Sequence, residues 1–142
     1  MIRHTARALC AASLIVTPLV LSTPAHAATT CRVNGVSVTG TTITGTPGSD
    51  YITCDTVDVM NVVNGAGGDD FISVGTANGP VAGGDGRDYI TVGTVGSSGS
   101  VLGQAGNDYI RVTTNNGSVD GGLAGLDYCR VTAGNPPTNC EF

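Results

Sequence analysis

The sequence predicts an all-β protein, a right-handed parallel β-solenoid of about five coils with 18–20 residues and two short strands in each. The first observation is a motif that occurs five times, G-x-x-G-x-D followed by an aromatic and an apolar residue. The second is its spacing, because the aspartates follow one another after 20, 18, 20 and 19 residues, a period typical of stacked repeats. The third is composition, since 22 glycines and many β-branched residues disfavour helices.

The N-terminus has the features of a secretory signal peptide. Arg3 and Arg7 precede an apolar run over residues 8–21, and Ala25-His26-Ala27 matches a small-x-small cleavage site. The apolar run is shorter than the ~20 residues that a membrane-spanning helix needs. We therefore expect cleavage after Ala27, secretion of residues 28–142 as one domain, and no membrane span in the mature chain.

The charge and composition of the mature chain argue against several classes of function. The mature chain contains no lysine, and its four arginines stand against eleven carboxylates, so its net charge is −7, compared with −5 for the whole sequence. Such a surface repels nucleic acid and anionic membranes and attracts cations. Both histidines, His4 and His26, precede the cleavage site, so the mature chain lacks the usual catalytic bases. We therefore expect a non-enzymatic protein.

Strand signals begin after an entry segment, residues 28–35. Residues 36–38 and 42–44 alternate apolar and hydroxyl side chains, as in half-buried strands. Each coil then has one strand of the form D-aromatic-I-x-V and a second strand centred on an apolar residue nine or ten positions earlier. The repeats are expected to cover about residues 36–131, and residues 132–142 to form a C-terminal cap.

Because side chains alternate along a strand, the repeats predict a core of three stacked rows. The strands after the glycine turns supply two of them, Ile52, Ile72, Ile90, Ile110 and Cys129, and then Cys54, Val74, Val92, Val112 and Val131. The opposite sheet supplies Ile43, Val63, Val81, Val101 and Val119.

The motif aspartates are the candidate site residues. Stacking would place their carboxylates in a row, ~4.8 Å apart. At an effective dielectric constant of ~20, each neighbouring pair of charges would then cost on the order of 3 kcal/mol. Calcium, which takes 6–8 oxygen ligands in irregular geometry, would offset this repulsion. In the alternative, each aspartate binds the amides of its own turn and no metal is needed. The residues are Asp50, Asp70, Asp88, Asp108 and Asp127.

The same motif resembles the G-G-x-G-x-D-x-U-x nonapeptide of the RTX (haemolysin-type) calcium-binding repeats. The resemblance covers residues 45–131 and implies a β-roll in which calcium lies between stacked turns and folding is coupled to the ion. It implies that the five aspartates are side-chain ligands. It also implies backbone carbonyl ligands in the turns marked by Gly48, Gly68, Gly86, Gly106 and Gly125.

Each motif aspartate is followed by an aromatic residue that is expected to point outward. These form a row of Tyr51, Phe71, Tyr89, Tyr109 and Tyr128. Such a row stabilises a sheet through cross-strand pairs, and it could also serve as a contact strip for sugar rings or a protein partner. The leading function is thus a secreted calcium-binding module. The alternative is a metal-free structural or adhesive solenoid with this strip as its contact surface.

The mature chain contains four cysteines, and an even number in a small secreted chain predicts two disulfides. Three connectivities are possible in principle. In a five-coil solenoid Cys54 and Cys129 lie four coils apart, ~19 Å, well beyond the ~7 Å that a disulfide allows between Cα atoms. Stacking therefore favours Cys31–Cys54 and Cys129–Cys140, one at each end.

Overall fold

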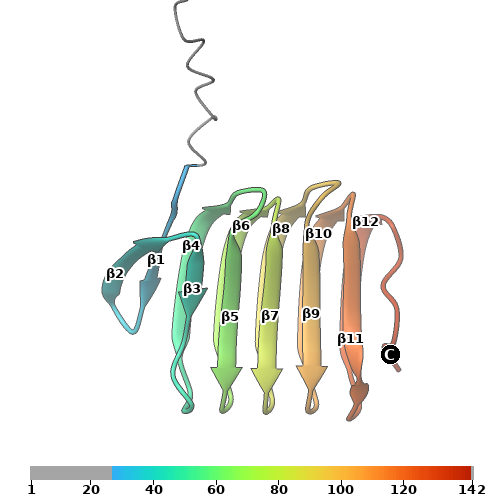
Figure 1. The fold of residues 1–142 in the computed structure, drawn as a ribbon. Coiled ribbons are helices and arrows are strands. Elements are labelled where there is room, and N and C mark those ends of the chain that lie inside the picture. The colour runs from blue at the N-terminus through green and yellow to red at the C-terminus, as the bar shows by residue number, and fades with distance from the viewer. Residues whose placement is uncertain (1–26, 142) are drawn as a thin grey trace, which may run out of the picture.

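The computed structural model describes residues 27–141, and the predicted signal peptide lies outside the described residues except for Ala27. The chain forms two facing sheets whose strands stack side by side along one axis (Figure 1). The seven-stranded sheet has the order β12 (Tyr128–Gly134), β10 (Tyr109–Asn115), β8 (Tyr89–Val95), β6 (Phe71–Ala77), β4 (Tyr51–Val57), β1 (Thr29–Val33) and β2 (Val36–Gly40). The five-stranded sheet has the order β11 (Ser118–Ala124), β9 (Ser100–Ala105), β7 (Pro80–Asp85), β5 (Val62–Gly67) and β3 (Thr42–Thr44).

The coils confirm the predicted parallel β-solenoid. Each coil takes one strand from each sheet, beginning with β3 and β4 and ending with β11 and β12. Strands of successive coils pair in parallel, with Ile52 opposite Ile72 and Ile43 opposite Val63. Among residues 27–141 there is no helix, and therefore none long and apolar enough to cross a membrane.

The core contains the three predicted rows and a fourth that the alternation rule missed. The four motif isoleucines and all five members of the row on the opposite sheet are at most 1% exposed. In β4 two consecutive residues, Asp55 and Thr56, are exposed, so the alternation of inward and outward side chains is interrupted there. The next residue, Val57, therefore points inward again. With Ala77, Val95 and Asn115 it forms the fourth row, and all four are fully buried.

The N-terminal end differs from the prediction. Residues 36–38 are not a half-buried strand of the first coil. They belong to β2, which pairs in antiparallel fashion with β1, and β1 pairs in antiparallel fashion with β4. Val36 is 65% exposed and Val38 36% exposed. The hairpin thus covers one end of the seven-stranded sheet, and the first coil begins only at Thr42.

The C-terminal end is covered by the segment after β12. Thr138 lies beside β11, where its amide donates to the carbonyl of Val119 at 2.9 Å and its carbonyl accepts from the amide of Gly121 at 3.0 Å. Both predicted disulfides are present in the structure. Their Cα–Cα distances are 4.4 Å for Cys31–Cys54 and 5.7 Å for Cys129–Cys140. Each bond joins a terminal segment to an end coil.

The last coil contains one extra residue in its turn. The pairing register of β11 with β9 shifts between Gly122 and Ala124, and Leu123 between them is 94% exposed. Gly122 therefore pairs with Gln104, and the structural counterpart of Gly103 is Gly121. The fifth copy of G-x-x-G-x-D begins at Gly122 in the sequence, so its first glycine is offset by one residue from the structural equivalent, Gly121. The signal of this offset in the sequence was the spacing from Val119 to Cys129, which is ten residues in place of nine.

Candidate functional site

The five motif aspartates lie just before the strands of the seven-stranded sheet, at one corner of each coil. Their side chains turn into the corner, and every one is at most 4% exposed. The structure thus brings all five predicted site residues into one buried row. This row is here called the aspartate ladder.

In the four aspartates after Asp50, one carboxylate oxygen connects its coil to the one before. The amide of Asp50 donates to Oδ1 of Asp70 at 2.7 Å, and the amide of Asp70 donates to Oδ1 of Asp88 at 2.9 Å. The amides of Asp88 and Asp108 continue the pattern at 2.8 and 2.9 Å. The Oδ1 atoms therefore satisfy buried backbone donors of the neighbouring coil.

Two residues that the sequence analysis missed close the ladder at its ends. At the first coil, the side-chain amide of Asn34 donates to Oδ1 of Asp50, while its oxygen accepts from the amide of Tyr51 at 2.9 Å. At the last coil, Oε2 of Glu141 accepts from the amide of Asp127. The sequence indicated these two residues only indirectly. Asn34 precedes Gly35 in a hairpin turn, and Glu141 follows the cysteine that joins the tail to the last coil.

The second carboxylate oxygen distinguishes the coils. Oδ2 of Asp50 accepts hydrogen bonds from the amide and the hydroxyl of Thr46. The Oδ2 atoms of Asp70, Asp88 and Asp108 are buried and have no hydrogen-bond partner among the described residues. An unpaired buried acceptor is costly, so these three atoms require an explanation.

Each unpaired Oδ2 lies against backbone of its own and the next coil. A Cβ placed on Gly65 would overlap both Oδ2 of Asp70 and the carbonyl oxygen of Gly83. The first glycine of the motif is thus needed because the carboxyl group occupies the space of its side chain. A proton on Oδ2 would turn this atom from an acceptor into a donor, which would remove the unpaired acceptor.

Burial changes the acid strength of the ladder. Desolvation raises the pKa of Asp70, and it raises the pKa of Asp88 and of Asp108 to about 6, even though the bonds from backbone amides act in the opposite direction. At Asp50 burial also acts to raise the pKa, but the bonds from Thr46 and Asn34 outweigh it and the pKa is lowered. The inner aspartates are therefore the ones that hold a proton most readily.

The glycines that mark the carbonyl ligands of the calcium hypothesis form a stack of their own. A Cβ on Gly86 would overlap the carbonyl oxygen of Gly68, and one on Gly106 would overlap that of Gly86, so these glycines stack directly on one another. The carbonyls beside the carboxyl groups belong to the first glycines of the motif, such as Gly83 and Gly103. Within residues 27–141, no three His, Cys, Asp or Glu side chains form a group that could hold a metal ion.

The aromatic row forms the continuous stack that the repeats predicted. Neighbouring ring centroids from Tyr51 to Tyr128 are 4.8–5.4 Å apart, and the ring planes differ by at most 11°. Tyr51 is 54% exposed, and Tyr89 and Tyr128 are each 38% exposed. Because the ring faces turn toward one another, the row presents ring edges and tyrosine hydroxyls to solvent. It is poorly suited to stacking on the faces of sugar rings.

No protein-family model matches the chain, and neither a curated protein nor a solved structure shows significant similarity to it.

Proposed function

We propose that the protein is a secreted, non-enzymatic and metal-independent β-solenoid that acts through the exposed face of its seven-stranded sheet. The aspartate ladder is the observation that carries this proposal. Its Oδ1 atoms bind backbone amides of the same protein, and Asn34 and Glu141 complete it at the two ends. The carboxyl groups thus have a structural role that needs no ion.

Secretion is part of the same proposal. The N-terminal sequence pattern supports it, and so do two disulfides, which persist in oxidising compartments outside the cytosol. They stabilise a small domain whose core is only four rows of mostly Val and Ile side chains.

Calcium binding is the second candidate, as the RTX resemblance implies. The unpaired Oδ2 atoms of Asp70, Asp88 and Asp108 favour it, because a cation would complete their coordination. Carbonyl oxygens of Gly83, Gly103 and Gly121 lie near these atoms and would serve as further ligands. A proton on Oδ2 is the solution that needs no ion, and it is available to Asp88 and Asp108 below about pH 6, where their raised pKa values keep the carboxyl groups neutral.

Thermal unfolding with and without calcium separates the two candidates. We expect the same melting temperature in excess chelator and in millimolar calcium, and no heat of binding in a calorimetric calcium titration. Ion binding to the folded form alone would stabilise it by ~2.7 kcal/mol per site at a hundredfold excess over Kd. A melting temperature that rises with calcium would therefore reject the metal-independent proposal in favour of the calcium module.

A further inference from the structure

A second lateral row runs across the outer face of the seven-stranded sheet, two residues along each strand from the aromatic row. The register places Arg32 of β1 opposite Thr53 of β4, and Arg111 of β10 opposite both Thr91 of β8 and Arg130 of β12. Ser73 of β6 lies between Thr53 and Thr91. The row therefore has guanidinium groups toward both ends and three hydroxyl groups between them. It is here called the arginine–hydroxyl row.

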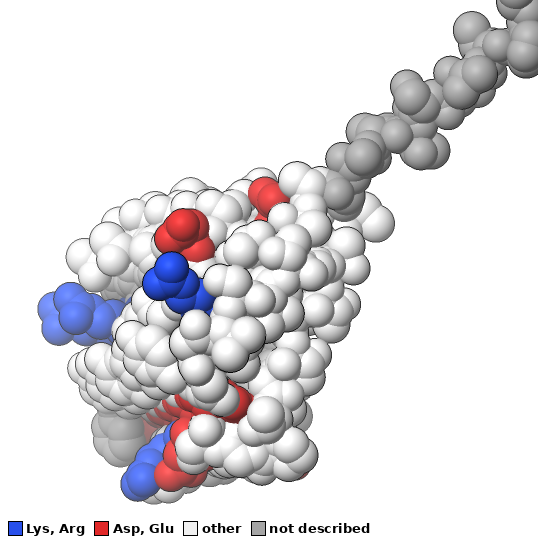
Figure 2. Space-filling model, turned by 90° about the vertical axis from the view of Figure 1, so that its left-hand side faces the viewer, with Lys and Arg blue, Asp and Glu red and all other residues white. Residues whose placement is uncertain are grey.

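The arginine side chains of this row make no polar contact with another described residue of the protein. Among the described residues, Arg32, Arg111 and Arg130 form no ion pair and donate no side-chain hydrogen bond, and all three are exposed. The fourth arginine, Arg87, lies in a turn and pairs with Asp69 at 3.0 Å. Figure 2 shows one basic group among acidic side chains on the lower edge, and one of the basic groups higher on the molecule lies directly beside an acidic side chain. The expected mature chain, with net charge −7, thus gathers three of its four arginines on one face.

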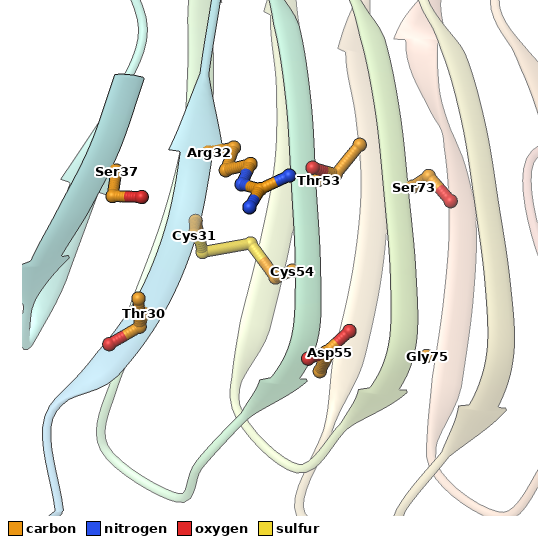
Figure 3. Close-up of a pocket in the computed structure, with 9 residues that line it drawn as sticks. All are labelled: Thr30, Cys31, Arg32, Ser37, Thr53, Cys54, Asp55, Ser73 and Gly75. Carbon is orange, nitrogen blue, oxygen red and sulfur yellow. A yellow bond between two sulfur atoms is a disulfide. The ribbon is translucent and has the colours of Figure 1, made fainter. Parts of the chain in front are cut away.

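A groove follows this row along the solenoid axis. Gly75 and Gly93 lie beside it, and a Cβ on either would meet the carbonyl oxygen of the preceding coil at 2.5 or 2.6 Å, so both positions lack a side chain. The hollow next to β1 has a volume of about 610 Å³ and is lined by Arg32, Thr53 and Ser73 (Figure 3). A second hollow of about 400 Å³ shares Ser73 and Gly75 with it and ends at Arg111. The two hollows therefore adjoin each other, and together they are here called the groove.

We propose that this groove binds an anionic polysaccharide chain that lies across the strands. Carboxylate or sulfate groups of the polysaccharide would pair with Arg32 at one end and with Arg111 and Arg130 at the other. Guanidinium groups bind such oxyanions through paired hydrogen bonds. Sugar hydroxyls would bond to Thr53, Ser73 and Thr91. Arg32 and Arg111 are four strand spacings apart, ~19 Å, so the occupant is an extended chain of several sugar units.

The distribution of charge selects this partner class. A nucleic acid carries a charge at every step, and it would be repelled by the acidic remainder of the protein. The groove instead offers positive charge only toward its ends and neutral hydroxyl groups between them. Asp55, which lines the hollow beside Arg32, further disfavours a dense polyanion. The inference deepens the proposed function and rests on it, because it names the partner of the same sheet face.

Calorimetry and affinity electrophoresis of the mature protein test the inference. The probes are hyaluronate, a carboxylated chain with one charge per disaccharide, and a sparsely sulfated dextran, with neutral dextran and single-stranded oligothymidylate as comparisons. We expect binding to one or both anionic chains and none to dextran. Arg32→Gln with Arg111→Gln should weaken it about tenfold or more, since bonds to charged groups are involved. The preferred probe identifies the anionic group.

Arg87→Gln is the matched control for Arg32→Gln alone, because each single substitution removes one positive charge, from different parts of the molecule. It should leave polysaccharide binding unchanged, and circular dichroism should show that all variants remain folded. An equal loss in Arg87→Gln, oligothymidylate binding as tight as polysaccharide binding, or no binding to either anionic chain would overturn the inference. These outcomes are independent of the calcium melts, which contain no polysaccharide and decide the proposed function separately.

Discussion

At the scale of single residues, a buried carboxyl group in this fold has two oxygens with different roles. Oδ1 accepts an amide of the neighbouring coil, as at Asp70 and Asp88, whereas Oδ2 faces backbone oxygen and has no donor among the described residues. A neutral carboxyl group fits both environments, because it accepts at one oxygen and donates at the other. A carboxylate fits only the first.

Substitution of Asp88 distinguishes the neutral carboxyl group from the carboxylate. In Asp88→Asn the side-chain oxygen can still accept from the amide of Asp70, and the NH₂ group can donate to the carbonyl of Gly103. We expect a melting temperature at neutral pH equal to or above that of the wild type. Asp88→Ala should instead lower stability by ~1–3 kcal/mol, because it leaves a buried amide unpaired. Equal losses in both variants, measured by thermal unfolding, would show that the negative charge itself is needed.

The pH dependence of stability follows from the raised pKa values. Asp88 and Asp108 have native pKa values of about 6, above the ordinary value of 3.8, so the native protein binds more protons than the unfolded chain between these limits. Their stabilisation is complete below about pH 3.8 and is lost as the pH rises through about 6. Asp50 and Asp69, whose pKa values are lowered, act oppositely in strong acid.

We therefore expect the melting temperature to be several degrees higher near pH 4.5 than at pH 7.5, measured by calorimetry. Asp88→Asn should flatten this dependence because one of the two groups no longer titrates. A melting temperature that climbs steadily from pH 4.5 to 7.5 would mean that the inner aspartates are ionised in the native protein.

At the scale of elements, the regular coils were predictable and the irregular ones were not. The repeat period and the alternation of apolar residues were sufficient to predict strands β4 to β10, because every coil there repeats the same inward isoleucine and the same glycine turn. The fourth core row was missed because strict alternation would point Val57 outward, whereas Asp55 and Thr56 are both exposed and shift the pattern by one residue. The hairpin of β1 and β2 was missed because nothing in Val36–Gly40 indicates an antiparallel partner rather than a further coil.

The candidate site was predictable to a similar degree. All five aspartates of the ladder were identified from the motif, since their positions repeat with the coils. The direction of each carboxyl group was not, because it depends on which backbone atoms of the neighbouring coil lie within reach. Asn34 and Glu141 were missed for the same reason, as each joins the ladder only through the folding of an end segment.

The bulge at Leu123 provides a test at this scale. Deletion of Leu123 would give the last turn the length of the regular ones, with Gly121 in the place of Gly103. We expect the deletion variant to fold with a melting temperature within a few degrees of the wild type, since this side chain is 94% exposed. Deletion of Ala105 in the regular turn should be strongly destabilising, because it moves Gly103 away from Asp108. Similar melting curves for the two deletions would contradict the register assigned to β11.

At the scale of the whole molecule, the solenoid is a one-dimensional array whose ends need cover. Each coil contacts mainly its two neighbours, so an end coil that loses its cap can open without the rest. The N-terminal end is covered by the hairpin, Asn34 and the Cys31–Cys54 bond. The C-terminal end is covered by Thr138, Glu141 and the Cys129–Cys140 bond. Polar bonds and a disulfide therefore act together at both ends.

Removal of one disulfide at a time should show that each cap stabilises the coils at its own end of the solenoid. The bonds close segments with sequence separations of 23 and 11 residues, and a loop of ~15 residues contributes ~3 kcal/mol on the chain-entropy estimate. In Cys129→Ser with Cys140→Ser, amide hydrogen exchange should accelerate first in β11 and β12 and least in β4, whereas Cys31→Ser with Cys54→Ser should give the reverse order. Because the caps act only on adjacent coils, the gradient should decline along the axis. Uniform acceleration in all coils would instead mean that the solenoid opens as a single unit and that the caps stabilise it globally.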